Sequence, residues 1–205
     1  MKILPHKIIV LLLLVDAVLH FTSCAADGPV PKNIIIMISD GGGFNHVDAA
    51  SLYQYGETGR QVYEQFPVRL AMSTYLIDQP PYNPDSAWAS FDYIKIKPTD
   101  SAASGTAIAT GVKTSFTRLG VDSSLTAVTN ITEQAEKIGK ATGVVTSVPF
   151  NNATPAAFVA HSEVRYNYEQ IARDMLAYSA VDVIMACGDA RFDDDGKPVI
   201  DPDFT

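Results

Sequence analysis

The sequence predicts an α/β fold with a largely parallel sheet. Three apolar segments, residues 34–38, 143–148 and 181–186, have the length and composition of buried strands. Helical patterns lie between them in the chain, at residues 45–55, 101–110, 132–140 and 168–178. Because strands that alternate with helices favour parallel pairing, this order indicates helices packed on a parallel sheet.

A glycine-rich turn separates the first predicted strand from the first predicted helix. Residues 34–38 are four isoleucines and one methionine, and Ser-Asp-Gly-Gly-Gly follows at 39–43. The glycines permit a tight turn, after which Val47 and Leu52 belong to the apolar side of a helix. The prolines between residues 78 and 92 predict a long surface loop.

The remaining elements follow the same alternation as far as residue 186. Ser101 begins a predicted helix that runs to about Thr110, and Gly139 stands near the end of the next one. After the third strand, a polar turn at 191–198 is followed by a stop at Thr205 without a closing helix or strand. We therefore expect the chain to be part of a longer domain and the fold to be incomplete at its C-terminus.

Composition and charge exclude several classes of protein. The 205 residues are 47% hydrophobic and 19% charged, which is an ordinary globular composition. A formal net charge of -8 without a basic stripe makes nucleic acid an unexpected partner. Two cysteines, Cys24 and Cys187, are too few for a disulfide scaffold or a thiolate zinc site.

The N-terminal segment has the layout of a secretory signal. Lys2 and Lys7 precede or flank an apolar run that ends at Leu14, and small residues follow at 23–26. We predict a signal peptide at residues 1–26 and a domain from residue 27 to residue 205. The protein is then exported and is periplasmic, secreted or lipid-anchored at the cell surface.

Two ways of processing this segment stay open. The sequence Phe-Thr-Ser-Cys at 21–24 is similar to a lipoprotein lipobox, with phenylalanine where leucine is usual. Processing at that point would attach lipid to Cys24 and anchor the protein to a membrane. The alternative is ordinary cleavage near Ala26.

Polar residues follow the predicted strands at their carboxyl ends, where ligands bind in open parallel sheets. Asp40 is placed there as a metal ligand, or as the N-cap of the helix that follows. Asp100 and Ser101 begin a helix rich in small residues, whose N-terminus suits a phosphate. The alternative is a helix start that Asp100 simply caps.

The third polar group begins at Asn151 and Asn152 and continues through Thr154 to Arg165. A guanidinium at Arg165 forms a fork that suits two oxygens of a tetrahedral anion. The alternative is a solvated arginine on a helix face. Ser101 lies in neither a Gly-x-Ser-x-Gly elbow nor a lysine-bearing phosphate loop, so its activation needs another device.

Together these motifs resemble the alkaline phosphatase family, in order and with suitable gaps. They are Ser-Asp-Gly-Gly-Gly at 39–43, Asp-Ser-Ala-Ala-Ser-Gly-Thr-Ala at 100–107, Gly-Val-Lys-Thr at 111–114, Ala-Thr-Pro-Ala-Ala at 153–157, and Ala-His at 160–161 with Arg165. The resemblance runs from about Pro31 to the end. It implies a central, largely parallel sheet flanked by helices, and a homodimeric enzyme that hydrolyses phosphate monoesters.

The resemblance also implies roles for individual residues. Ser101 would be the nucleophile that becomes phosphorylated, and Asp100 would orient Arg165, which would hold the phosphate. Two zinc ions and one magnesium ion would be bound, with Asp40 bridging a zinc and the magnesium and Ser101 bound to zinc. Thr154 would be a magnesium ligand.

The sequence departs from the family pattern in two respects. Asn152 stands where the family has Asp or His around the magnesium, so a charge is missing there. The second departure is truncation, because the resemblance implies that histidine and aspartate zinc ligands and a magnesium glutamate lie in a C-terminal half that this chain lacks. His46 and His161 match no zinc-ligand motif, so we expect the chain alone to be inactive. Alternatives are a non-catalytic phosphate-binding remnant, or a phosphodiesterase or sulfatase relative, although Ser101 lacks the Pro-x-Arg sequence of sulfatases.

Overall fold

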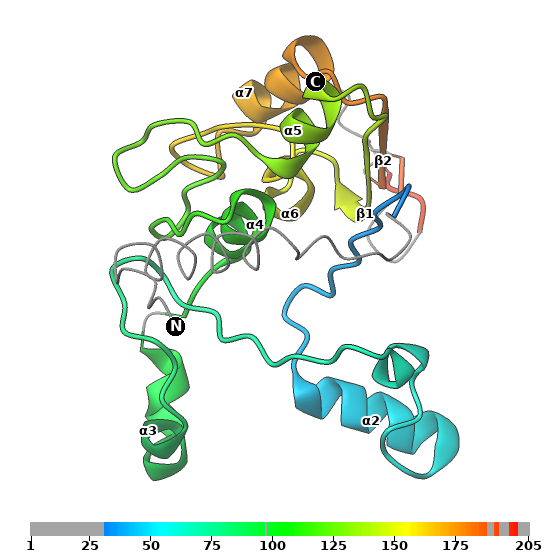
Figure 1. Ribbon diagram of the computed structural model, residues 1–205, viewed down its shortest axis with the longest axis vertical. Coiled ribbons are helices and arrows are strands. Elements are labelled where there is room, and N and C mark those ends of the chain that lie inside the picture. The colour runs from blue at the N-terminus through cyan, green and yellow to red at the C-terminus, as the bar shows by residue number, and fades with distance from the viewer. Residues whose placement is uncertain (1–30, 97, 188–190, 193–196, 201–205) are drawn as a thin grey trace, which may run out of the picture. The chain divides into compact units, whose positions relative to one another are not determined.

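The computed structural model describes residues 31–96, 98–187, 191–192 and 197–200 (Figure 1). The chain divides into two units, Met1–Ser39 and Asp40–Thr205, which are described separately. The predicted signal segment at 1–26 and Cys24 lie outside the described residues. No helix among the described residues has the length and apolar character needed to cross a membrane.

The described part of the first unit forms neither a helix nor a strand. Residues 34–38 are exposed, with fractions between 41% for Ile38 and 92% for Met37. The prediction of a buried strand there is therefore wrong for the described structure. A strand needs hydrogen bonds to a neighbouring strand, and none to residues 31–39 occurs within the described part of the chain.

The second unit contains the predicted alternation of helices and strands. In chain order its elements are α2 Phe44–Tyr55, the 3-10 turn η1 Val62–Gln65, α3 Pro84–Ala89, the 3-10 turn η2 Phe91–Lys95, α4 Ser101–Thr110, α5 Ile131–Lys137, β1 Gly143–Pro149, α6 Ala153–Ala156, α7 Tyr168–Arg173, the π-helical turn η3 Asp174–Tyr178 and β2 Val183–Cys187. The four predicted helices are thus confirmed, the last one ending as η3.

The predicted surface loop at 78–92 is partly helical, which corrects the expectation. Asn83 caps α3, because its side-chain oxygen accepts a hydrogen bond from the backbone N–H of Ser86 at 2.8 Å. Pro84 occupies the first turn of the helix, where backbone N–H groups have no hydrogen-bond partner within the helix, so the N–H that proline lacks is not needed. The proline therefore begins a helix here instead of preventing one.

The strands β1 and β2 pair in parallel, which confirms the α/β class and the predicted strand direction. Gly143 lies opposite Val183, and Val144 lies opposite Ile184. Only one face of the pair is covered, since Val144 and Ile184 pack against the core whereas Val145 and Met185 are 74% and 59% exposed. The apolar runs predicted burial on both faces, so the described structure differs in this respect.

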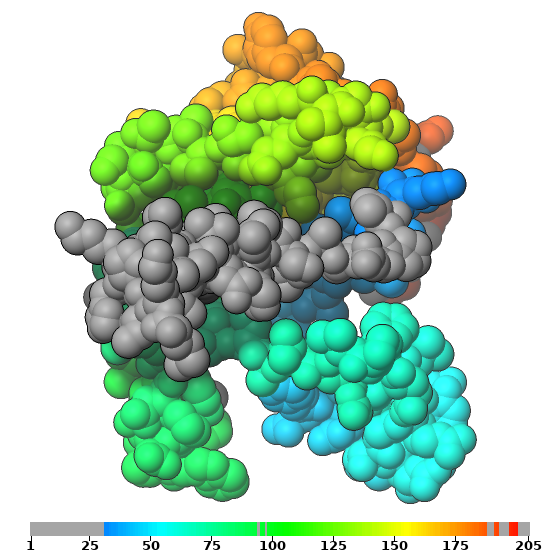
Figure 2. All heavy atoms as spheres, in the orientation of Figure 1, coloured from blue at the N-terminus to red at the C-terminus, as the bar shows by residue number. Residues whose placement is uncertain are grey.

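The core lies between helices that meet through small side chains. Ala102 and Ala109 of α4, Ala153 and Ala156 of α6, and Ile171 of α7 are buried in one cluster. Figure 1 shows the helices α4 to α7 gathered beside the two strands, and in Figure 2 the residues of α5 lie on the face turned toward the viewer. This packing places the N-terminus of α4 beside that of α6.

The closest approach between α4 and α6 depends on Gly105. A Cβ atom added to Gly105 would lie 2.9 Å from the Cβ atom of Ala157, which is shorter than real side-chain contacts. Because both neighbours are already minimal in size, a larger residue at 105 must move a helix. Gly105 therefore sets the spacing between the two helices that carry the candidate site.

We predict that Gly105→Ala lowers the free energy of unfolding by about 1–3 kcal/mol, as overpacking does in a tight core. Chemical denaturation measures this change. Gly105→Ala combined with Ala157→Gly relieves the contact and recovers part of the loss. Ile108→Ala, at a more exposed position of α4, is the control, and an equal loss in both single variants would contradict the packing argument.

Candidate functional site

Asp100 and Ser101 stand at the N-terminus of α4, as the sequence predicts. The Oδ1 atom of Asp100 accepts a hydrogen bond from the backbone N–H of Ala103 at 3.1 Å, so Asp100 is the N-cap. Ser101 is the first helical residue and is half-buried. Its hydroxyl therefore lies at the positive end of the helix dipole, where an anion is favoured.

Asp40 binds two hydroxyl groups from distant parts of the chain. Its Oδ2 atom accepts hydrogen bonds from Ser101 Oγ at 2.7 Å and from Thr154 Oγ1 at 3.1 Å. The N-cap of α2 is Gly43, so the alternative role of Asp40 as a helix cap is wrong. Asp40 instead joins the turn before α2 to the starts of α4 and α6.

Arg165 lies against Asp100 and Asn152 rather than in solvent. Its Nη1 atom is 3.2 Å from Asp100 Oδ2, and its Nη2 atom donates to Asn152 Oδ1 at 3.3 Å. The side chains of Arg165 and Asp100 are only 17% and 9% exposed. The alternative of a solvated arginine is therefore wrong, and Arg165 Nε is buried without a hydrogen-bond partner.

The structure thus brings all the predicted site residues into one cluster, which we call the α4 site. Its members are Asp40, Asp100, Ser101, Asn152, Thr154 and Arg165. Arg165 pairs with Asp100, whereas Asp40 contacts only hydroxyl groups among the described residues, so the site carries one uncompensated negative charge. A phosphate would be repelled by this charge unless a cation bound beside Asp40.

The oxygen atoms around Asp40 fit part of a magnesium site. Asp40 Oδ2 lies within hydrogen-bond distance of both Ser101 Oγ and Thr154 Oγ1, so three oxygen atoms from three segments converge at one point. These three oxygens are hard donors of the kind that magnesium prefers.

The described residues do not complete a zinc site. No group of three or more His, Cys, Asp or Glu side chains is placed to hold a metal within the part of the chain that the structure describes. His46 accepts a hydrogen bond from the backbone N–H of Gly43 through Nδ1 at 3.1 Å. Zinc needs three or four protein ligands, of which the α4 site offers only Asp40 and Ser101.

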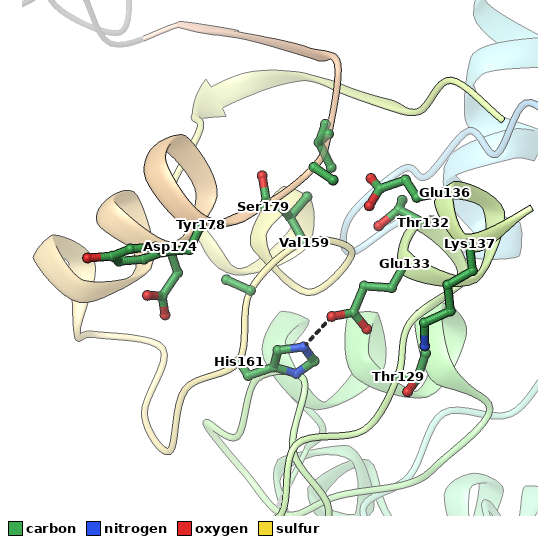
Figure 3. A pocket seen from close by; sticks show the side chains of 13 residues that line it. Thr129, Thr132, Glu133, Glu136, Lys137, Val159, His161, Asp174, Tyr178 and Ser179 are labelled. Atoms are coloured by element: carbon green, nitrogen blue, oxygen red, sulfur yellow. Dashed lines mark hydrogen bonds and ion pairs between the residues drawn. The ribbon is translucent and has the colours of Figure 1, made fainter. Parts of the chain in front are cut away.

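A second polar pair, His161 with Glu133, lies in a cavity of about 390 Å³ beside α5 (Figure 3). The Nε2 atom of His161 is 3.0 Å from Glu133 Oε1, and its Nδ1 atom contacts the carbonyl oxygen of Gly120. Each ring nitrogen of His161 therefore has an oxygen partner, one from a carboxylate and one from a backbone carbonyl. Figure 3 shows the two side chains pointing toward each other.

Sequence reasoning did not single out Glu133, although a local signal was present. Asn130 and Glu133 form a capping box, in which Asn130 Oδ1 accepts from the Glu133 N–H at 3.0 Å and Glu133 Oε2 accepts from the Asn130 N–H at 2.9 Å. Burial raises the pKa of Glu133, but hydrogen bonds from His161 and the Asn130 backbone and the charge of His161 outweigh it, so the pKa is lowered overall.

The fold and the α4 site define the class of protein to which the chain belongs. It is an α/β protein with a serine at a helix N-terminus, a carboxylate bound to that serine, and a buried arginine beside it. The alkaline phosphatase family model matches residues 31–198. The chain therefore belongs to the alkaline phosphatase family.

Individual relatives agree with this assignment. The chain is 36% identical to alkaline phosphatase 4 of Bacillus subtilis, over 78% of this chain and 34% of that protein. A cold-active alkaline phosphatase from a psychrophilic Shewanella species is 36% identical with a TM-score of 0.61, covering 76% of this chain and 36% of that one. The chain thus spans about a third of the length of the curated relatives it matches.

A second similar structure is named as a magnesium-bound form. It is a variant of the alkaline phosphatase from the Antarctic bacterium TAB5 with magnesium bound in its M3 site. This chain is 34% identical to it with a TM-score of 0.59, and the match covers 75% of this chain and 38% of that one.

We predict that Glu133 stabilises the fold at neutral pH and that this contribution disappears in acid. Because its pKa is lowered in the folded state, the contribution is present above the usual value of 4.5 and is lost as the pH falls through the folded pKa. Glu133→Gln should therefore reduce the free energy of unfolding at pH 7 but not at a pH below the folded pKa.

Denaturant unfolding of both proteins between pH 7 and pH 3 measures this difference. Glu163→Gln, which removes an exposed carboxylate from the same region, is the matched control. A Glu133→Gln effect that stayed constant over the whole pH range would contradict the prediction.

Proposed function

We propose that the protein hydrolyses phosphate monoesters with the help of divalent metal ions, through a phosphoserine intermediate on Ser101. One observation carries this proposal: the Ser101 hydroxyl lies at the N-terminus of α4, within 2.7 Å of Asp40, on the helix whose cap Asp100 binds Arg165. A nucleophile, a carboxylate and an anion-binding cation therefore share one helix end. Membership of the alkaline phosphatase family supports the same activity.

In this proposal Arg165 binds the phosphate group of the substrate. Its guanidinium has N–H donors beyond the two that contact Asp100 and Asn152, and its Nε atom is buried without a partner. Charge-assisted hydrogen bonds from this fork, together with the dipole of α4, hold the phosphorus atom near Ser101 Oγ. Asp100 fixes the guanidinium plane and prevents Arg165 from rotating toward solvent.

The hydroxyl of Ser101 then attacks the phosphorus and the alcohol of the ester leaves. Asp40 Oδ2 accepts the hydrogen bond of that hydroxyl and orients its oxygen before the attack. Water subsequently releases phosphate from the serine. The transition state spreads charge over the phosphoryl oxygens, so catalysis requires positioning and neutralisation of charge more than covalent assistance.

Metal ions would be held at the Asp40 end of the site. Asp40, Ser101 and Thr154 are the proposed ligands, and a bound divalent cation would neutralise the excess negative charge and favour the alkoxide of Ser101. Asn152 Oδ1 accepts from Arg165 and from the Ala153 N–H, so we propose that it acts on magnesium only through water. Two zinc ions and one magnesium ion are implied by the family, and the zinc ions need donors beyond the described residues.

Substrate class, assembly and location complete the proposal. Phosphate monoesters are the proposed substrates, and a homodimer is the proposed assembly, both from family membership. Export is proposed from residues 1–26, with lipid attachment at Cys24 and ordinary cleavage near Ala26 as its two alternatives. A phosphate-binding role without catalysis is the alternative, and the excess negative charge of the α4 site makes it less favourable in the absence of a cation.

We predict that Ser101→Ala abolishes the phosphoenzyme and lowers the rate of aryl phosphate hydrolysis by several orders of magnitude. The full-length protein is assayed with zinc and magnesium, and the phosphorylated residue is trapped at acid pH and identified by mass spectrometry. Ser104→Ala, on the same helix, is the matched control and should retain turnover. Phosphate trapped on another residue would contradict the assignment of Ser101.

We predict that Arg165→Ala weakens competitive inhibition by inorganic phosphate and lowers kcat/KM. The loss should correspond to about 2–4 kcal/mol of transition-state stabilisation, the range for a charge-assisted contact in a desolvated site. Arg173→Ala removes an exposed arginine paired with Glu169 and serves as the control. An unchanged inhibition constant for phosphate in Arg165→Ala would place this arginine outside the binding site.

A further inference from the structure

Thr117 has a backbone conformation that is unusual for its residue type. Its φ angle is +67°, in the left-handed region, where glycine and asparagine are favoured and a β-branched residue is disfavoured. The hydrogen bond from the Arg118 N–H to the Ser115 carbonyl closes a turn in which Thr117 is the third residue. A positive φ at that position is typical of a type II turn.

Both main-chain polar groups of Thr117 form hydrogen bonds with residues of the α4 site. Its N–H donates to Asp100 Oδ1 at 3.3 Å, and its carbonyl oxygen accepts from the backbone N–H of Arg165 at 2.9 Å. Asp100 also binds the guanidinium of Arg165 through Oδ2. The three residues therefore form a closed ring of hydrogen bonds in which Thr117 holds the main chain of Arg165 and Asp100 holds its side chain.

We propose that Thr117 is a positioning residue that fixes Arg165 for phosphate binding through its main chain; this inference depends on the function proposed above. An arginine side chain has several rotatable bonds, and its guanidinium is placed accurately only when both ends are fixed. The left-handed conformation lets one residue direct its N–H to Asp100 and its carbonyl to Arg165. Backbone strain of this kind is often found at functional sites.

The other described non-glycine residue with a positive φ serves as a contrast. Leu125, at +67°, lies in the turn between Val121 and Ala127, where its N–H donates to the carbonyl of Asp122. That conformation closes a hairpin. At Thr117 the same conformation links two residues of the candidate site that lie far apart in the sequence.

The inference is tested with Thr117→Pro in the full-length protein. Proline fixes φ near −65° and removes the N–H, so both hydrogen bonds should be lost. Phe116→Pro is the matched control, because proline is favoured at the second position of the same turn. The dissociation constant for inorganic phosphate, measured by calorimetry with magnesium present, should rise at least about ten-fold in Thr117→Pro and remain within about two-fold in Phe116→Pro.

A double-mutant cycle separates positioning from a general loss of stability. If Thr117 acts through Arg165, Thr117→Pro changes the phosphate dissociation constant less than about two-fold when Arg165→Ala is already present. Thr117→Gly, which accepts the left-handed conformation, should keep the affinity within about two-fold of the parent. A large loss in Thr117→Gly, or an additive effect in the cycle, would overturn the main-chain role.

Two further results decide the remaining cases. If Thr117→Pro does not fold, the Phe116–Thr117 amide is replaced by an ester, which removes the same N–H donor. This replacement should weaken phosphate binding at least about three-fold. Unchanged binding overturns the inference. Binding that depends on Arg165 but not on Thr117 overturns this inference alone. A parent protein without Arg165-dependent phosphate binding overturns the proposed function as well.

Discussion

The candidate site depends on the hydrogen bonds and the ion pair of the Asp100 carboxylate. This carboxylate accepts hydrogen bonds from the N–H groups of Ala103 and Thr117 and forms an ion pair with Arg165, while only 9% of the side chain is exposed. Removing a carboxylate from water costs several kcal/mol unless donors compensate for it. Three donors from three segments provide that compensation, so the helix start, the turn at 117 and the arginine form one unit.

The spacing between α4 and α6 depends on small residues. Gly105 and Ala157 let the two helices approach until no further side-chain atom would fit between them. This approach brings Thr154, at the start of α6, and Ser101, at the start of α4, to the same oxygen of Asp40. The small residues after Ser101 therefore serve helix packing, and they position the polar groups of the site through that packing.

The charge balance of the α4 site explains why its chemistry needs a cation. Asp100 compensates Arg165, which leaves Asp40 as the uncompensated carboxylate beside the Ser101 hydroxyl. A dianionic phosphate placed there meets the repulsive potential of the Asp40 charge. The hydroxyl and carboxylate oxygens around Asp40 offer a divalent ion the hard donors it prefers, and its charge would reverse the sign of that potential.

The sequence by itself determined the features that depend on neighbouring residues. The cap at Asp100, the helix that begins at Ser101, and the parallel pair β1 and β2 follow from local patterns and agree with the structure. The exposure of residues 34–38, the pairing of Glu133 with His161, and the conformation of Thr117 were decided only by tertiary structure. Each depends on contacts, present or missing, with residues far away in the chain, and periodicity and capping signals extend over only a few residues. A threonine in the left-handed region is the clearest case, because its own chemistry disfavours the conformation that hydrogen bonds to Asp100 and Arg165 hold in place.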